Sequence, residues 1–319
     1  MNLESVSRLW VMMKREVWES PFAFKWTPVI IAGFVLLFTI LALIIGARVD
    51  NEMVFTKDGI RQFAELAVDN RSLLLYGVAI SISAIYTQVM FVVVVFYLAG
   101  SLYDDRRDRS ILFWKSLPIS DTMTVLSKIL TAVVLAPVVY LAGTILIHLI
   151  LLIIATGYSF LAGVNPFTAI WGPSNLLSMW TLLLFGSIVQ GLWLLPLYAW
   201  ILFCSSWAPR LPILIATLVP VLIGIFQQFW SFFSDFRFST ENLMITILER
   251  IGRGVVPANI QWEEIADGSN RIQRPAEEML MSYGSVWESL MSVQMWIGIA
   301  IGVAFIVGSI WFRKRATDS

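Results

Sequence analysis

The stretch FVVVVFYLAGSLYDDRRDRSILFWKSLPIS, residues 91–120, decides the fold class. It closes an apolar run of about two dozen residues, and six consecutive charged residues, Asp104 to Arg109, follow at once. A helix needs about 20 apolar residues to cross a bilayer, and charges are costly inside it. The stretch therefore predicts a membrane span that ends at a water boundary.

The composition indicates the same class. Hydrophobic residues make up 58% of the 319 residues, charged residues make up 14%, and the mean hydropathy is +0.78. Soluble domains carry roughly 45–50% apolar and about 25% charged residues. We expect an integral membrane protein, and the net charge of zero gives no reason to expect a nucleic-acid partner.

Six apolar segments are long enough to span a membrane. They cover residues 28–46, 78–102, 125–156, 176–203, 211–233 and 293–312. The third, at ~48 Å, exceeds a ~30 Å bilayer core, so it should tilt or project, with a kink at Pro137. We predict one all-α domain over 1–319: six transmembrane helices, an N-terminal interfacial helix over 1–25, and a small extracytoplasmic helical region within 234–292.

The loop charges set the expected orientation. With the N-terminus inside, the inner side holds 13 of the 22 basic residues but only 8 of the 22 acidic ones. An excess of Lys and Arg in short loops marks the cytoplasmic side. Both termini and the loop 103–122 are therefore expected in the cytoplasm.

The N-terminal segment reads as an amphipathic helix. One helical face holds Leu3, Val6, Leu9, Trp10, Met13 and Val17, while most charges lie elsewhere. Trp10, Trp18 and Trp26 suit the level of the lipid headgroups. We expect a helix that lies in the inner membrane interface before the chain turns into the membrane near Pro21.

Catalytic and nucleotide-binding patterns are missing from the sequence. It contains no GxxxxGK[ST] loop, a single histidine, His148, and a single cysteine, Cys204. We expect no metal site and no enzyme activity in this chain, and a structural hydrogen bond for His148. The spans hold almost no charge except Lys128, which disfavours an ion-coupled carrier.

The loop after the second span combines charge with an apolar patch. The run Asp104–Arg109 reads as a helical turn, Ile111 to Trp114 are apolar, and Pro118 ends the helix. Such a helix fits a groove on a partner protein. It fits equally well on lipid, with Trp114 as an interface anchor, and the spacing does not decide between the two.

The run DDRRDRSILFWKSLPIS, followed by LSKIL, resembles the cytoplasmic loop of ABC-2 type transporter permeases. Leu117, Pro118, Ile119 and Ser120 match that family's Leu-Pro-Ile-Ser, and Lys128 matches the lysine that enters its third span. Arg109, Lys115 and Ser127 depart from its pattern. The six spans, the N-terminal helix and the larger outer loop before the last span also agree with the family.

The resemblance implies a permease subunit of an exporter in the bacterial inner membrane. Such a subunit pairs with a second copy or a related half and binds a separate ATPase subunit, which holds ATP and Mg²⁺. The coupling residues implied are Asp105, Arg106, Asp108, Arg109, Ile111, Leu112, Phe113, Trp114 and Pro118. The alternative is a scaffold or assembly subunit of an ATPase-driven envelope complex that carries no solute.

The resemblance also places the second and fifth spans across the dimer axis. Their uncharged polar residues Ser81, Gln88, Gln227 and Gln228 are candidates for lining a path, which would suit an amphipathic or hydrophobic cargo. The alternative is that these groups form helix–helix hydrogen bonds within one subunit. Gly298 and Gly302 form a GxxxG motif, either by chance or for close helix packing in a dimer.

Overall fold

The computed structural model describes residues 3–48, 57–109, 119–233, 242–255 and 283–316, and every element in these ranges is a helix. Six helical segments are long and apolar enough to cross a membrane: Phe22–Ile45, Val68–Arg107, Asp121–Leu161, Phe167–Trp207, Pro212–Trp230 and Val293–Arg315. They confirm the predicted number of spans, and the chain has the character of a multi-pass membrane protein. The patch 111–114 and most of the segment 234–292 lie outside the described residues.

The elements follow one another along the chain with short connections. They are α1 (Leu3–Glu19), η1 (Phe22–Trp26), α2 (Thr27–Arg48), α3 (Lys57–Glu65), α4 (Val68–Arg107), α6 (Asp121–Leu130), η2 (Thr131–Leu135), α7 (Ala136–Leu161), η3 (Phe167–Trp171), α8 (Gly172–Ser174), α9 (Leu176–Trp207), α10 (Pro212–Phe233), α11 (Leu243–Val255), α14 (Tyr283–Met291) and α15 (Val293–Arg315). The elements labelled η are single π-helical turns.

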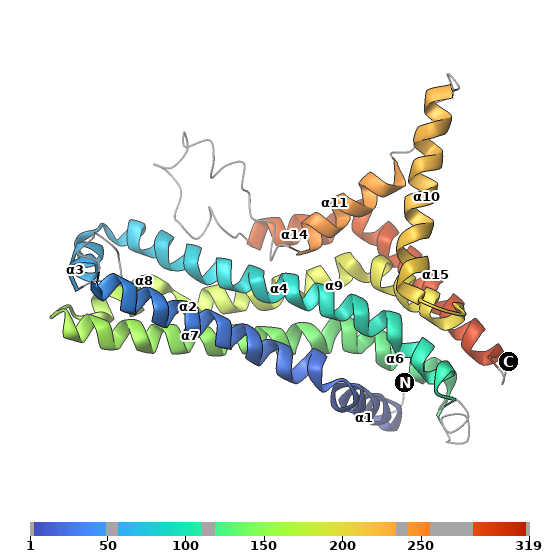
Figure 1. Cartoon of the computed structure of the whole chain (residues 1–319), viewed down its shortest axis with the longest axis horizontal. Helices are drawn as coiled ribbons and strands as arrows, with labels where there is room; N and C mark the ends of the chain where they lie inside the picture. Colours follow the sequence, from blue (N-terminus) through green and yellow to red (C-terminus); the bar gives the residue numbers. More distant parts are fainter. Residues whose placement is uncertain (1–2, 49–56, 110–118, 234–241, 256–282, 317–319) are drawn as a thin grey trace.

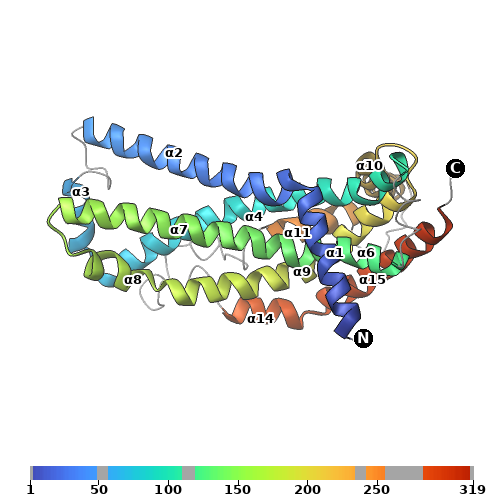
Figure 2. The same cartoon turned by 90° about the horizontal axis from the view of Figure 1, so that it is seen from below.

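Helices α4, α7 and α9 run side by side along the long axis of the molecule, and α2 lies on their outside (Figures 1 and 2). Helix α1 crosses one end of this bundle, where it packs on α6, whereas α3 and α8 lie at the other end. We call these the α1 end and the α3 end. At the α1 end, α15 packs along α9.

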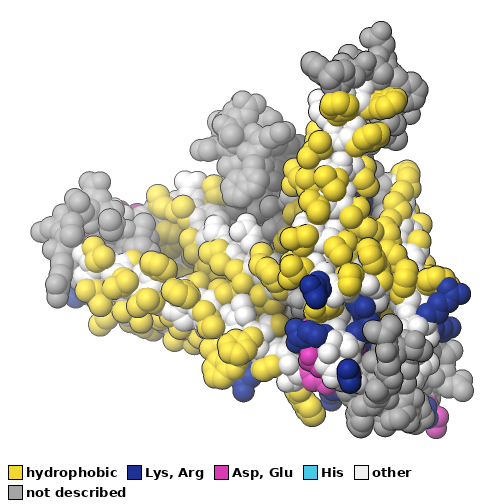
Figure 3. Space-filling model, turned by 45° about the vertical axis from the view of Figure 1, so that its right-hand side comes forward, with side chains coloured by type: hydrophobic (Ala, Val, Ile, Leu, Met, Phe, Trp, Pro, Cys, Tyr) yellow, Lys and Arg dark blue, Asp and Glu magenta, His cyan; other side chains and the backbone are white. Residues whose placement is uncertain are grey.

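Helix α10 leaves the bundle and projects away from it (Figure 1), and Figure 2 views it nearly end-on. Most of its large apolar side chains are exposed, including Leu222, Ile225 and Phe229. Figure 3 shows hydrophobic side chains over α10 and the flank of the bundle, with charged side chains gathered toward the α1 end. Apolar surface of this extent needs lipid or protein around it rather than water.

Each of the three π-helical turns is followed by a proline two residues later: Pro28, Pro137 and Pro173. The residue before each proline, Thr27, Ala136 or Gly172, donates its N–H to the carbonyl five residues back. A proline has no N–H, and its ring clashes with the carbonyl four residues back, so a wider turn relieves the clash. Pro137 therefore acts through the turn that precedes it, and the helix continues to Leu161.

The wide turns leave backbone carbonyls free for contacts between helices. The Ala23 carbonyl, which a regular α-helix would pair with Thr27, accepts a hydrogen bond from the Tyr140 hydroxyl at 2.8 Å. The Val133 carbonyl, which Pro137 cannot pair, lies against Gly191 of α9, where an added Cβ would come within 2.6 Å of the oxygen. The prolines thus determine where α7 meets α2 and α9.

Helix α1 buries a narrower face than the sequence pattern predicts. Met12, Met13 and Glu16 are buried, whereas Trp10 and Trp18 are exposed. The exposed aromatic residues leave the predicted lipid contact of α1 open. The burial of Glu16 shows that α1 is also held by the bundle.

His148 forms structural hydrogen bonds, as predicted. Its ring lies between Ala79 and Trp180: Nε2 is 3.1 Å from the Ala79 carbonyl, and Nδ1 is 3.4 Å from the Trp180 indole nitrogen. The indole can only donate, so Nδ1 accepts and Nε2 carries the proton. The side chain joins α4, α7 and α9.

Both glycines of the GxxxG motif make close contacts within this chain. A Cβ at Gly302 would come within 3.0 Å of the Leu195 side chain, and one at Gly298 would overlap the guanidinium of Arg250. The motif therefore serves the packing of α15 against α9 and α11.

Replacing Gly191 by alanine tests the contact with the Val133 carbonyl. The added methyl would meet a backbone atom that cannot rotate away, so we expect a loss of about 1–3 kcal/mol in the free energy of unfolding. Gly33→Ala is the matched control, because nothing lies within 4 Å of a Cβ there. Unfolding in mixed micelles measures both, and equal effects would contradict the packing role.

Candidate functional site: a buried charge cluster beside residues 110–118

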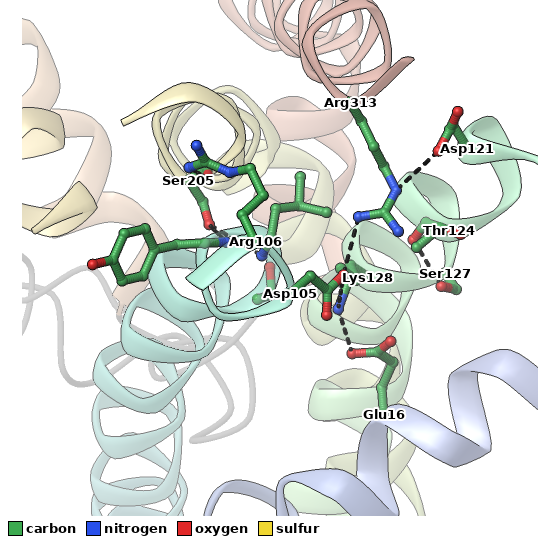
Figure 4. Close-up of polar contacts among 12 residues, drawn as sticks. Glu16, Asp105, Arg106, Asp121, Thr124, Ser127, Lys128, Ser205 and Arg313 are labelled. Atoms are coloured by element: carbon green, nitrogen blue, oxygen red, sulfur yellow. Dashed lines mark hydrogen bonds and ion pairs between the residues drawn. The ribbon is translucent and has the colours of Figure 1, made fainter. Parts of the chain in front are cut away.

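Six charged side chains meet at the α1 end, where α4 ends and α6 begins on either side of residues 110–118. They are Arg15 and Glu16 of α1, Asp105 of α4, Asp121 and Lys128 of α6, and Arg313 of α15, and we call them the charge cluster (Figure 4). Their formal charges cancel. Because a buried charge is costly without a partner, this pairing allows the cluster to lie away from water.

Lys128 lies at the centre of the cluster. Its ammonium is 3.2 Å from Glu16 and 3.8 Å from Asp105, and the side chains of Lys128 and Glu16 are each only 3% exposed. The one charge that the sequence places in a span is thus paired with carboxylates from two other helices, α1 and α4.

Glu16 uses both of its carboxylate oxygens. Arg15 donates to Oε1 at 2.7 Å, while Lys128 and the Tyr97 hydroxyl donate to Oε2 at 3.2 and 2.8 Å. Burial raises the pKa of Glu16, but the charges of Lys128 and Arg15 and the hydrogen bonds together outweigh it and leave the pKa below its usual 4.5. Glu16 is therefore ionised at neutral pH and holds α1 against α4 and α6.

Arg313 joins the last helix to both sides of residues 110–118. Its Nη1 donates to Asp105 at 3.0 Å, and its Nε is 3.2 Å from Asp121. The planar guanidinium can reach two carboxylates at once, which a lysine cannot do with the same geometry. A single side chain thus fixes the end of α4 relative to the start of α6.

Arg106 connects the end of α4 to the end of α9. It donates to the carbonyls of Ser205 and Ala208 at 2.9 and 2.8 Å, where α9 leaves its last carbonyls unpaired. A cation at this position also complements the negative end of the helix dipole. The Ser205 hydroxyl accepts from the backbone N–H groups of Leu102 and Tyr103, which tightens the same junction.

Ser120 begins α6 as its N-cap, and its hydroxyl accepts from the Met123 N–H at 3.2 Å. Asp121 follows in the first turn, where the helix dipole favours a negative charge. The end of the Leu-Pro-Ile-Ser motif therefore marks a helix start, and it positions Asp121 for Arg313.

The predicted coupling residues separate into two groups. Asp105 and Arg106 point into the protein, whereas Arg107 and Asp108 pair with each other at 2.9 Å on the surface and Arg109 is exposed. Residues 104–107 form the last turn of α4, so these charges end a long helix rather than begin a short one. The other five, Ile111, Leu112, Phe113, Trp114 and Pro118, lie outside the described residues.

The predicted path residues do not meet within this chain. Ser81 and Gln88 are exposed on α4, whereas the part of α10 that carries Gln227 and Gln228 projects away from α4 (Figure 1). Gln227 accepts from the Leu243 N–H at 2.8 Å, at the start of α11. For Gln227, the alternative of a hydrogen bond between helices of one subunit is confirmed.

Glu16, Asp121 and Arg313 are the members of the cluster that the sequence did not single out. Glu16 did carry a signal, because it follows Leu9 and Met13 at helical spacing on the apolar side of α1. Asp121 and Arg313 look like ordinary charges at helix ends. Their pairing depends on α15 meeting α4 and α6, which lie almost two hundred residues earlier in the chain.

Within the described ranges, no group of three or more His, Cys, Asp or Glu residues is arranged to hold a metal ion. Comparisons with protein-family models, curated proteins and solved structures found no match. The function must therefore be inferred from the geometry of the charge cluster and the sequence around it.

Breaking the Glu16–Lys128 pair tests the cluster. We expect Glu16→Gln and Lys128→Met each to lower the free energy of unfolding by about 3–5 kcal/mol, because each leaves a buried charge without its partner. The double variant should lose less than the sum of the two. Chemical unfolding in mixed micelles measures this cycle.

The exposed pair Arg8–Glu4 provides the control for that cycle. Glu4→Gln should cost about 0–1 kcal/mol, as exposed ion pairs do. Additive losses for Glu16 and Lys128 would show that the two side chains are not coupled.

Proposed function

We propose that this chain is the membrane subunit of an ABC-2 type exporter, which works as a dimer with a separate ATPase subunit. Residues 110–118 then dock on the ATPase, and the charge cluster passes the movement of that loop to the transmembrane helices. The observation that carries the proposal is the position of Arg313, which joins both sides of the loop to the last helix.

The contacts around the loop support transmission of movement. The α4 side holds Asp105 and Arg106, and the α6 side holds Asp121 and Lys128. Through these residues the loop is linked to α1, α9 and α15. Separating buried ion pairs without replacing their partners costs several kcal/mol, so displacement of the loop should move the attached helices together.

The proposed membrane arrangement places the α1 end at the cytoplasmic surface of the bacterial inner membrane. The loop charges favour this orientation. Helix α1 then lies in the interface, with the exposed Trp10 and Trp18 toward the headgroups and Lys14 5.3 Å from the Trp10 ring. Its buried side, which holds Glu16, faces the bundle.

Docking of the loop is tested by changing Phe113 and Trp114 together to aspartate. We expect the variant to lose co-purification with the ATPase subunit, because two charges would enter an apolar cleft. Changing both residues to leucine is the control and should preserve binding. Retention of the ATPase by the aspartate variant would show that the patch does not dock there.

Transmission of movement is tested at Arg313. A single thiol at position 293, the exposed start of α15, is introduced as Val293→Cys in a Cys204→Ser background. We expect ATP to change the labelling rate of this thiol in the complex. Arg313→Leu should abolish the ATP-dependent change while the ATPase remains bound.

The control for Arg313 is the exposed neighbour Lys314, where Lys314→Leu should respond to ATP as the parent does. Arg313→Lys keeps the charge but cannot bridge Asp105 and Asp121 in the same way, and should respond weakly. An undiminished response in Arg313→Leu would mean that the cluster does not transmit movement.

A further inference from the structure

An apolar cavity of about 460 Å³ lies where α9, α10, α11 and α15 meet. Its lining includes Pro196 and Trp200 of α9, Pro220 and Ile223 of α10, and Ile301 and Phe305 of α15. This volume falls in the range of roughly 300–1,000 Å³ that is typical of sites for small organic ligands. The cavity is separate from the charge cluster, since Arg313 lies in the last turn of α15 and the cavity lies along its first half.

One end of the cavity is charged. Arg250 of α11 donates through Nε to the Trp193 carbonyl at 2.8 Å, and its guanidinium lies 4.6 Å from the centre of the Trp193 ring. Gly298 leaves the space that the guanidinium occupies. These contacts hold a cation in a fixed place against an otherwise apolar cavity.

Arg250 keeps unused binding capacity. Its Nη2 is buried and has no hydrogen-bond partner in the part of the chain that the structure describes, and none of the carboxylates described there forms an ion pair with it. Burial lowers the pKa of Arg250, because desolvation disfavours the charged form. An anion at this position would offset the cost of burying the guanidinium.

The charges around this end also favour an anion. Glu249, Arg250 and Arg253 all line the cavity, so the local balance is one positive charge. A neutral polar compound would leave that charge without a partner. A head group that carries one or two negative charges would match it.

A second, more polar pocket of about 230 Å³ adjoins the charged end. It shares Trp193, Arg253 and Gln294 with the apolar cavity, and its own lining includes Gln190, Ser289 and Ser292. In the opposite direction the apolar lining continues along α15 from Gln294 to Phe305, about 16 Å for eleven residues of helix. The two spaces together therefore offer a polar place for a head and an elongated apolar place for a tail.

We propose that these two spaces form a binding site for an anionic amphiphile, with its carboxylate or phosphate head at Arg250 and a single alkyl chain along α15. The proposal does not depend on the exporter function, because the site stands on the geometry of α9, α10, α11 and α15 alone. A fatty acid and a lysophospholipid share this chemistry, and the experiment distinguishes them.

The test uses the full chain in nanodiscs of phosphatidylcholine and a palmitic acid that carries a photoactivatable diazirine on its chain. We expect crosslinks, located by mass spectrometry, on α15 between residues 297 and 305 and on α10 between residues 219 and 223. Unlabelled palmitate or lysophosphatidate should compete, and the stronger competitor identifies the head group. Palmitate methyl ester, which has no charge, should compete about tenfold less well or worse.

Two pairs of variants separate the charged end from the apolar cavity. Arg250→Gln should weaken labelling by about tenfold or more, whereas Arg210→Gln, at an exposed arginine before α10, should not. Ile301→Trp fills the apolar cavity without touching Arg250 and should block labelling. Val303→Trp adds the same side chain at an exposed position of α15 that does not line the cavity, and should leave labelling intact.

Equal competition by the methyl ester, or unchanged labelling of Arg250→Gln, would overturn recognition of the anion. Labelling spread over the exposed faces of α2 and α10, and unaffected by Ile301→Trp, would overturn the site itself. If Arg250→Gln does not fold, as judged by gel filtration, the comparison of Ile301→Trp with Val303→Trp decides the proposal.

Discussion

The pairing of buried charges at the α1 end is the interaction on which the arrangement of the surrounding helices depends. Lys128 lies between Glu16 and Asp105, and Arg313 lies between Asp105 and Asp121. None of these groups can be buried alone at an acceptable cost, so each helix end is stable only when the others are in place. The cluster therefore joins helices that are far apart in the sequence, and it does so beside residues 110–118.

A second constraint comes from the prolines. Pro28, Pro137 and Pro173 each follow a π-helical turn, and the carbonyls released there are used by other helices. Tyr140 bonds to one of them, and Gly191 allows close approach to another. In a bilayer core no water can satisfy a free backbone carbonyl, so such contacts stabilise a bend and also determine which neighbour packs there.

The two constraints place polar groups differently. The charge cluster gathers formal charges at one end of the bundle, where Figure 4 shows them converging from separate helices. Arg250, by contrast, sits at the other end of α15 with a buried nitrogen that no described group satisfies. A structure that pairs its other buried charges so fully makes this single exception the most informative cation outside the cluster.

The sequence by itself determined the number and position of the apolar segments, because a stretch of about 20 apolar residues has few alternatives to a membrane helix. It also indicated that His148 would be structural and that Lys128 was unusual. The tertiary structure alone decided the direction of each charge in the run Asp104–Arg109. Because α4 continues to Arg107, successive side chains turn by about 100°. That rotation directs Asp105 to α6 and α15, Arg106 to α9, and Arg107 to the surface, and no property of the run itself distinguishes these three positions.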